Sequence, residues 1–158
     1  MTTLSNPAKG KAFRDAARSI LEHELGVHLL PEVALQVGHP PKDHRFDLVS
    51  EDRKWILECK NLAWRANGGV PQAKLTSITE AAAGLLQCVQ RSCTRALVLG
   101  RATHSKQRET LAEYYVRLHR HILAAVVAVA EIDAAARTLR WLVRPEAVGL
   151  EALGEHEE

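Results

Sequence analysis

Cysteine is scarce in this chain and follows no recognisable pattern. The 158 residues include three cysteines, and no two of them have the Cys-x-x-Cys spacing of a metal or redox motif. The odd number and the wide scatter argue against a disulfide framework and against a structural zinc site. This cysteine usage favours a reducing compartment, so we expect a cytoplasmic protein.

Long hydrophobic runs are absent as well. The most apolar stretch, 122–130, is shorter than the roughly 20 residues that a helix needs to cross a bilayer. Residues 1–10 lack the apolar segment of a secretory signal peptide, and we expect no membrane partner. Because the chain shows no repeat and no low-complexity linker, it predicts one domain over residues 1–150 and an acidic flexible tail over 151–158.

Common nucleotide-binding and hydrolase motifs are missing too. The chain contains no GxxxxGK(S/T) loop, GxGxxG fingerprint, GxSxG elbow or HExxH zinc motif. His119 and His121 are two positions apart on a predicted helix, so they face different sides and make a poor metal pair. The chemistry of this chain must lie in a less distinctive group of residues.

The overall composition is that of a globular protein with a mild basic excess. Hydrophobic residues make up 46% of the chain and charged residues 25%, which is enough to build a core. The formal net charge is +2, and residues 1–150 carry 21 basic and 15 acidic side chains. This excess favours a nucleic-acid partner.

Residues 45–60 predict a β-hairpin around which the chain is organised. Strand-forming residues occupy Phe46–Val49 and Trp55–Cys59, and the polar run Ser50–Lys54 between them suits a tight connection. Side chains alternate along a strand, so Trp55, Leu57 and Cys59 share one face of the second strand and Ile56, Glu58 and Lys60 share the other.

The hairpin brings two acids and a lysine close together. Pairing about its turn places Asp47 roughly opposite Leu57, which allows the carboxylates of Asp47 and Glu58 to converge. Buried charges need a partner or a metal, and Mg²⁺ prefers oxygen ligands such as these. With Lys60 nearby, the group suits phosphodiester hydrolysis, and the alternative interpretation is a surface ion pair at the end of a strand.

Other elements are predicted from periodicity and from capping signals. They are a helix from Asn6–Pro7 to Gly26, a strand over 31–38, a loop over 61–74, a helix from the capping box Ser77–Glu80 to about Gln90, a buried strand over 96–99, a helix over 106–121 and a hairpin of strands 125–132 and 138–143. The apolar stripe of the last helix is formed by Leu111, Tyr115, Leu118 and Ile122.

Several basic side chains are candidates for contacts with DNA. They are Arg65, Lys74, Lys106 and Arg108. Lys11, Arg14 and Arg18 lie on the polar side of the first helix, where we favour a solvated face over contacts with phosphate. Trp64 is expected to pack against the base of its own loop, and the thiol of Cys59 to lie in the core.

The order α-β-β-β-α-β over residues 7–100 resembles the common core of the PD-(D/E)XK nuclease superfamily, which has the restriction-endonuclease-like fold. In that pattern the first acid lies on the second strand, as Asp47 does, and the second acid and the lysine lie on the third, as Glu58 and Lys60 do. The resemblance implies an α/β fold with a mixed central sheet flanked by helices. This chain would add a C-terminal helix and β-hairpin.

The same resemblance implies a Mg²⁺-dependent DNA endonuclease, with Mn²⁺ as a substitute. Asp47 and Glu58 would bind the metal together with the backbone carbonyl of Cys59, and Lys60 would position or activate the attacking water. Many relatives carry a supporting acid early in the first helix, where this chain has Phe13-Arg14. Asp15 and Glu22 are the nearby acids that could take its role, although neither is in the matching position.

Two alternative functions and a homodimer are also predicted. The missing acid favours, as an alternative, a catalytically weak or inactive nucleic-acid-binding module of the same fold acting within a larger complex. A structural protein in which Asp47, Glu58 and Lys60 form a plain ion-pair cluster is the other. The cleavage of two strands by one site per chain predicts a homodimer through the C-terminal third, with Tyr114, Tyr115 and Trp141 among its large side chains.

Overall fold

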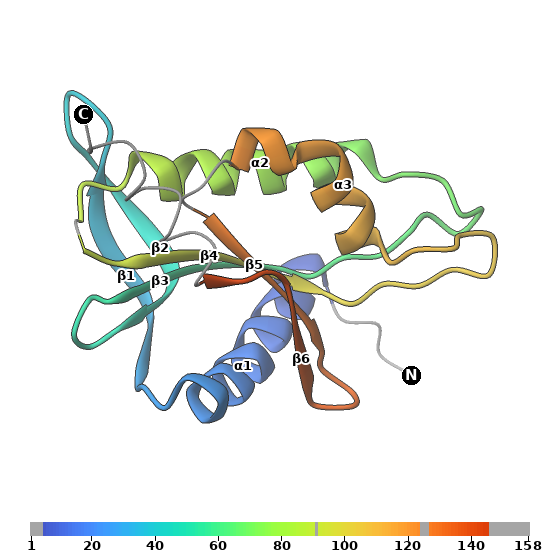
Figure 1. Cartoon of the computed structure of the whole chain (residues 1–158), viewed down its shortest axis with the longest axis horizontal. Helices are drawn as coiled ribbons and strands as arrows, with labels where there is room; N and C mark the ends of the chain where they lie inside the picture. The colour runs from blue at the N-terminus through green and yellow to red at the C-terminus, as the bar shows by residue number, and fades with distance from the viewer. Residues whose placement is uncertain (1–4, 91, 124–126, 146–158) are drawn as a thin grey trace, which may run out of the picture.

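Among the residues that the structure describes, six strands form one mixed sheet in the order β1-β2-β3-β4-β5-β6, and helices cover both of its faces (Figure 1). The computed structural model describes residues 5–90, 92–123 and 127–145. The elements are α1 Asn6–Leu25, β1 Leu29–Val37, β2 Lys42–Ser50, β3 Trp55–Lys60, α2 Gln72–Gln87, β4 Thr94–Gly100, α3 Leu111–Leu123, β5 Val127–Asp133 and β6 Thr138–Val143. The prediction of an α/β fold with a mixed sheet flanked by helices is confirmed. The predicted tail over 151–158, and residue 125 at the start of the predicted last hairpin, lie outside the described residues.

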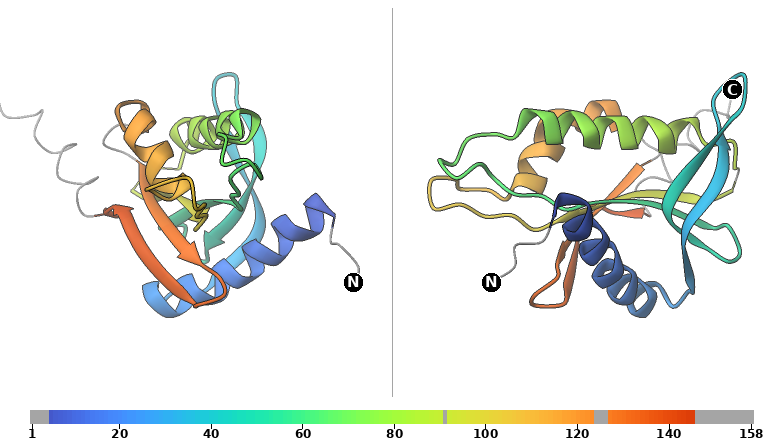
Figure 2. Two further views of the ribbon diagram at one scale, coloured as in Figure 1. Left: turned by 90° about the vertical axis from the view of Figure 1, so that its right-hand side faces the viewer. Right: turned by 180° about the vertical axis from the view of Figure 1, so that it is seen from behind.

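The directions of the strands explain where the helices lie. β1, β2 and β3 are antiparallel neighbours, β3, β4 and β5 run parallel, and β6 returns antiparallel to β5. Parallel neighbours need a crossover connection, and α2 and α3 supply these connections on one face of the sheet. α1 covers the opposite face (Figure 2). β3 and β4 therefore end at the same edge of the sheet, where the chain passes into two loops.

Side chains of the sheet alternate between two hydrophobic cores. The core on the α1 side includes Phe13, Ala17, Leu21, Leu48, Leu57 and Val98. The core on the side of α2 and α3 includes Phe46, Ile56, Ile78, Leu85, Leu97 and Tyr115. Because Ile56 and Leu57 enter different cores, the predicted alternation along the second strand of the hairpin is confirmed.

The first helix begins and ends close to the predicted positions. Ser5 is its N-cap, and the Ser5 hydroxyl accepts a hydrogen bond from Ala8 N–H at 3.3 Å, so the cap lies one residue before the predicted Asn6. Gly26 ends the helix in the left-handed region at φ 64°, as its lack of a side chain allows. Within the described residues, no helix is long and apolar enough to cross a bilayer.

The second helix begins five residues before the predicted capping box. α2 starts at Gln72, and the Ser77 hydroxyl donates to Lys74 O at 2.7 Å from inside the helix. The prediction that Ser77 caps the helix is therefore wrong. The backbone before it is already helical, so the Ser77 side chain bonds back to the preceding turn.

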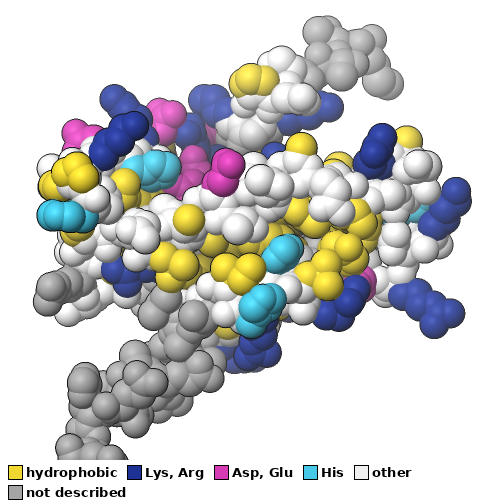
Figure 3. Space-filling view, turned by 90° about the horizontal axis from the view of Figure 1, so that it is seen from above, with side chains coloured by type: hydrophobic (Ala, Val, Ile, Leu, Met, Phe, Trp, Pro, Cys, Tyr) yellow, Lys and Arg dark blue, Asp and Glu magenta, His cyan; other side chains and the backbone are white. Residues whose placement is uncertain are grey.

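The third helix begins five residues after the predicted position 106, and its capping box lies at 110–113. Thr110 N–H donates to Glu113 Oε1 at 3.0 Å, and Glu113 N–H donates to the Thr110 hydroxyl at 3.1 Å. Lys106 therefore lies in a loop. Leu118 and Ile122 are 39% and 45% exposed, so the predicted apolar stripe is buried only in part. Figure 3 shows hydrophobic side chains spread over the face formed by α2 and α3.

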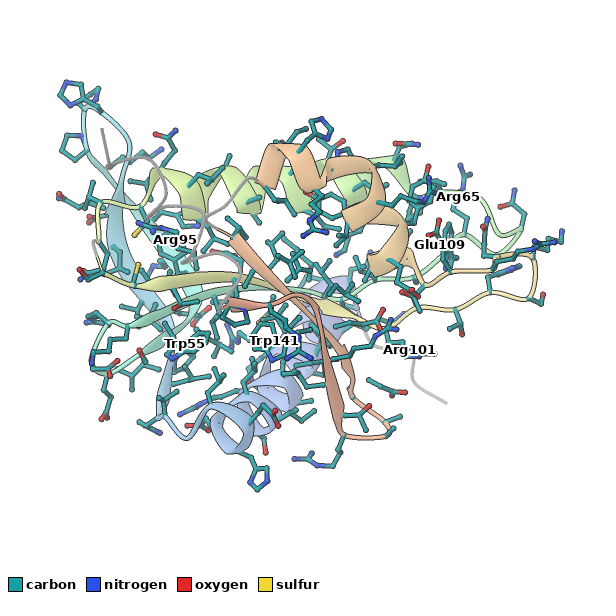
Figure 4. The ribbon with its side chains drawn as sticks, viewed as in Figure 1. Trp55, Arg65, Arg95, Arg101, Glu109 and Trp141 are labelled. Atoms are coloured by element: carbon teal, nitrogen blue, oxygen red, sulfur yellow. The ribbon has the colours of Figure 1, made fainter. Side chains whose placement is uncertain are left out.

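Aromatic side chains of the C-terminal third pack within the chain. Tyr115 is fully buried, so it is not available to a partner subunit. Trp141 lies beneath the sheet beside Trp55, with ring centroids 6.4 Å apart (Figure 4). These contacts belong to the core of one chain, and they explain why large side chains occur here.

Two loops that follow β3 and β4 lie side by side and project from the sheet (Figures 1 and 2). Residues 61–71 and 101–110 form this projection, which we call the two-loop arm. His104 Nε2 forms a hydrogen bond with Ala66 O at 3.0 Å, and Gln107 donates to Gly68 O at 2.7 Å. Gly68 has φ 82°, and a Cβ there would lie 3.0 Å from the His104 ring, so glycine permits this contact.

Candidate active site

The strands β2 and β3 separate where Asp47 and Glu58 lie. Backbone pairing between the two strands ends at Leu48 and Leu57. The prediction that Asp47 lies opposite Leu57 is therefore wrong by one residue, because the chain reverses symmetrically about the turn 51–54. Beyond the last pair, β2 continues beside β1 and β3 continues beside β4, which opens a notch between them.

The Asp47 side chain occupies this notch. Its Oδ2 accepts a hydrogen bond of 2.8 Å from the backbone N–H of Cys59. This N–H lies on the edge of β3 that faces β2, where a backbone carbonyl would accept it in a paired sheet. The Asp47 carboxylate takes the place of that carbonyl. This bond orients Asp47 and leaves the second oxygen, Oδ1, for another ligand.

Glu58 is a buried acid beside a second acid. It is 6% exposed, and a hydrogen bond of 3.1 Å joins Glu58 Oε1 to His44 Nε2. Burial raises the pKa of Glu58 to about 9, and the negative charge of Asp47 adds to the rise, while Lys60 opposes it. Without a cation, the Glu58 carboxyl therefore holds its proton at neutral pH.

The two acids open into a surface pocket of about 390 Å³ at the carboxyl end of β3. The pocket is lined by residues of the first turns of α1 and of the start of α2. Its charged lining residues are Lys11, Arg14, Glu32, Asp47, Glu58, Lys60 and Lys74. The fold thus brings together the predicted Asp47, Glu58 and Lys60, and it adds the predicted Lys74.

Close approach of β4 shapes one wall of the pocket. Asn61 follows Lys60 and lines the pocket beside Gly100, the last residue of β4. A Cβ at Gly100 would lie 3.0 Å from Asn61 Oδ1 and 3.3 Å from Leu62 N, so a larger residue would push the chain outward. Glycine at this position keeps the wall in place.

Positive charge is concentrated in the pocket. Burial lowers the pKa of Lys74, and the positive charge of Lys60 lowers it further. Two ammonium groups that repel each other in this way are stabilised when an anion enters between them. The pocket therefore has groups for a cation and for an anion side by side.

No acid of α1 lines the pocket. Asp15 is about half exposed and accepts a hydrogen bond from Lys11 at 2.8 Å. Glu22 accepts from Leu29 N–H at 3.1 Å, near the other end of the helix. Neither of them takes the position of the supporting acid, and Arg14 lines the pocket there. Arg14 is largely buried and pairs with Glu32, so the expectation of a solvated helix face is wrong for this residue.

The donors fit a hard divalent cation. Asp47 Oδ1 and the Glu58 carboxylate are oxygen donors, and burial together with the negative charge of Asp47 raises the pKa of Glu58, so a cation between the two carboxyl groups would favour the ionised form of Glu58. Within the described residues, no group of three or more His, Cys, Asp and Glu side chains forms a metal site. Mg²⁺ does not require one, since it is commonly bound by one or two carboxylates together with waters and substrate phosphate.

The remaining predicted DNA contacts lie on the two-loop arm. Arg65, Lys106 and Arg108 are all exposed there, and Figure 3 shows basic side chains at this end of the molecule. Trp64 is buried as predicted, but its indole N–H donates to Ala102 O at 3.0 Å, on the neighbouring loop. The arm starts at Asn61, which also lines the pocket.

The Cys59 thiol has no catalytic role in this arrangement. Its side chain packs against the core on the α1 side, as predicted. Burial raises the pKa of this thiol well above its ordinary value, so it stays protonated. Cys59 can contribute only backbone atoms to the site.

Two residues of the site were not predicted as part of it. His44 contacts Glu58, and its ring lies beside Gly84 of α2. Glu32 lines the pocket from β1. Alternation along the two strands places His44 on the same face as Phe46 and Glu58, and this pattern could have indicated His44 from the sequence. No sequence pattern indicated Glu32.

Comparison of the chain with protein-family models, with curated proteins and with solved structures gave no match.

Proposed function

We propose that this chain is a metal-dependent nuclease that hydrolyses phosphodiester bonds in DNA, with the restriction-endonuclease-like core that its resemblance implies. The observation that carries the proposal is the pocket in which Asp47 and Glu58 lie together with Lys60. Two neighbouring carboxyl groups, one of them buried, suit a divalent cation, and the lysine and arginine side chains beside them suit a phosphate.

Each side chain has a role in this reaction. A bound Mg²⁺ would polarise a phosphoryl oxygen and make a bound water more acidic. Asp47 and deprotonated Glu58 would hold the ion, and Lys60 would donate a hydrogen bond to the attacking water or to the charge developing on the phosphate. The water oxygen bonds to phosphorus while the bond to the leaving sugar oxygen breaks; the attacking water gives a proton to solvent, and the leaving oxygen takes up a proton from solvent to become a hydroxyl.

A polynucleotide fits this surface better than a small phosphate ester does. Arg65, Lys106 and Arg108 lie on the two-loop arm, outside the pocket, where a small substrate would not reach them. Contacts of this kind with successive phosphates provide most of the affinity of proteins for DNA.

Nicking of a supercoiled plasmid by the pure protein tests the proposal. We expect cleavage with Mg²⁺ or Mn²⁺, no cleavage in EDTA, and loss of activity in Lys60→Ala. The matched control is Lys54→Ala, which makes the same change at an exposed position in the β2–β3 turn and should leave cleavage unchanged. Equal activity in wild type and Lys60→Ala would show that the cleavage comes from a contaminant. Linear, single-stranded and branched DNA assayed in parallel would define the substrate.

A second function is favoured by one observation, the absence of an acid of α1 from the pocket. In that case the chain is a nucleic-acid-binding module of the same fold that acts within a larger complex. It would bind DNA in a salt-dependent manner without cleaving it under any metal. Titration calorimetry with Mn²⁺ separates the two functions, because the nuclease binds the ion through Asp47 and Glu58 and loses this binding in Asp47→Asn.

A further inference from the structure

Arg14 is a largely buried arginine in the pocket, and its contacts account for only part of its hydrogen-bonding groups. The side chain is 14% exposed and lines the pocket beside Asp47 and Lys60. Its Nη1 lies 3.3 Å from Glu32 Oε1. Its buried Nε lies 3.9 Å from Asp15 Oδ1, too far for a hydrogen bond, and has no hydrogen-bond partner among the residues that the structure describes. A guanidinium has five N–H donors in a planar fork, so donors remain for a ligand.

Glu32, the partner of Arg14, is held in an unusual backbone conformation. Its φ of 53° lies in the left-handed region although it is in the middle of β1, and residues other than glycine rarely adopt this conformation. The neighbouring pairs Pro31–Leu48 and Val33–Phe46 place it across from Asp47. Strain of this kind persists where the surrounding structure imposes it, and here it brings a third carboxylate to the pocket.

The acidic side chains of the pocket do not balance its positive charge. The cations Lys11, Arg14, Lys60 and Lys74 outnumber the acids Glu32, Asp47 and Glu58, and a divalent cation on the acid pair would increase the difference. Glu32 is 61% exposed, so its pairing with Arg14 is open to solvent and to exchange with another anion. A phosphate offers the same planar pair of oxygens that an arginine fork binds in a carboxylate.

We propose that Arg14 is a phosphate-binding residue whose guanidinium exchanges the Glu32 carboxylate for a phosphodiester of the substrate. Arg14 lies at the position where relatives of the resembled superfamily carry an acid. Its positive charge would then take the place of the charge that a second metal ion would otherwise provide. The site would work with one metal ion. This inference rests on the proposed function, and it identifies the group that binds the phosphate.

Two substitutions with opposite expected effects on DNA binding test whether Arg14 exchanges Glu32 for a phosphate. In EDTA, where no cleavage occurs, binding of a fluorescein-labelled 20-base-pair duplex is followed by anisotropy against salt. Arg14→Gln should weaken binding about tenfold and reduce the salt slope by about one, because one phosphate contact is lost. Glu32→Gln should strengthen binding, because the competing anion is gone. Weaker binding in both variants would show that the pair is only a structural ion pair and would overturn the proposal.

Matched variants distinguish the loss of the contact between Arg14 and phosphate from a loss of stability or of net charge. Arg18→Gln makes the same change one turn further along α1, where Arg18 pairs with Glu22 outside the pocket, and it should leave binding unchanged. Arg14→Lys keeps the charge but loses the fork, and it should give an intermediate affinity. Thermal melting of each variant shows that it is folded. Equal weakening in Arg14→Gln and Arg18→Gln would overturn the specific role of Arg14.

Calorimetry with Mn²⁺ distinguishes failure of this inference from failure of the proposed function. One ion per chain in wild type and in Arg14→Gln supports a one-metal site. Two ions per chain in wild type would overturn the substitution of Arg14 for a second metal and would leave the nuclease function standing. No bound ion in wild type would refute the nuclease function, and the anisotropy measurements would still decide whether Arg14 binds phosphate.

Discussion

Glu58 lies in an environment unlike that of an ordinary surface acid. It is almost fully buried, it forms a hydrogen bond with His44, and its protonated carboxyl also bonds to the side chain of Asp47. Its pKa of about 9 means that the fold favours the neutral carboxyl. A site that binds a cation must overcome this preference, which couples metal binding to proton release.

The stability of the metal-free protein should therefore fall as pH rises. Between the ordinary pKa of 4.5 and the folded value of about 9, the unfolded chain carries a carboxylate where the folded chain keeps a proton. Glu58→Gln removes this difference, because its neutral amide can still bond to His44. We expect the variant to match wild type near pH 5 and to be more stable at pH 8, by roughly 2 kcal/mol. Urea melts at both pH values measure this, and an equal gain at pH 5 would contradict the explanation.

Metal affinity should rise as pH rises, whereas the stability of the metal-free protein falls. Below pH 9 the Glu58 carboxyl must lose its proton before it can bind a cation. The apparent Kd for Mn²⁺ should therefore fall up to about tenfold for each unit of pH between 6 and 8. Calorimetry in two buffers with different ionisation enthalpies should show about one proton released per ion at pH 7. A Kd that is independent of pH would contradict the assignment of Glu58 as a ligand.

At the scale of elements, α3 is joined to the sheet through its first turn. The buried carboxylate of Glu131 on β5 accepts a hydrogen bond from the Thr110 hydroxyl, and Arg140 of β6 donates to it at 2.7 Å. Arg101, which follows β4, donates to the same carboxylate at 3.4 Å. Thr110 therefore caps α3 and also satisfies a buried charge.

Thr110→Ala should destabilise the protein by more than the loss of an ordinary cap, about 2–3 kcal/mol, because Glu131 also loses a donor. The melting temperature should fall by roughly 2–4 °C for each kcal/mol. Thr110→Ser keeps the hydroxyl and should be nearly neutral. Ser77→Ala is the control inside α2, where the hydroxyl caps nothing, and it should change stability by less than about 0.5 kcal/mol. Equal losses at the two positions would contradict the assignment of the cap.

At the scale of the whole molecule, basic side chains occur both in the pocket and on the two-loop arm. The triple variant Arg65→Ala, Lys106→Ala and Arg108→Ala should reduce the salt slope of DNA binding by about 2–3, since three phosphate contacts are lost. The pair Lys42→Ala and Lys54→Ala removes exposed charge at the start of β2 and in the β2–β3 turn, and it serves as the control. Anisotropy titrations at several salt concentrations measure both. An unchanged slope in the triple variant would show that DNA does not contact the arm.

The homodimer through the C-terminal third stays a prediction, and the structure changes which side chains it would use. Tyr115 is buried within the chain, whereas Leu118 and Ile122 of α3 are exposed. We expect light scattering at micromolar concentration to give twice the 17.5 kDa mass of one chain. Leu118→Glu should shift the mass to that of one chain without lowering the melting temperature. A single-chain mass for wild type, unchanged by DNA and metal, would rule out the dimer and would favour a nicking enzyme.

Local patterns in the sequence were sufficient to predict much of this protein. The alternation of Ile56, Leu57 and Glu58 predicted the strand, and the short polar turn before it predicted the hairpin that carries Asp47. Gly26 marked the end of α1, and the apolar run 96–99 marked the buried parallel strand β4. These features depend on periods of two or 3.6 residues and on neighbours close in the chain, so the residues themselves determine them.

Only the tertiary structure decided which similar signals have an effect and which distant side chains meet. Ser77 and Thr110 begin the same kind of motif, yet Thr110 alone begins a helix, because α2 is already helical before Ser77. Arg14 and Glu32 enter the pocket because α1 packs across the sheet and β1 is strained opposite Asp47. These outcomes depend on how a helix docks and where two strands separate, and such long-range contacts have no periodic signal in the sequence.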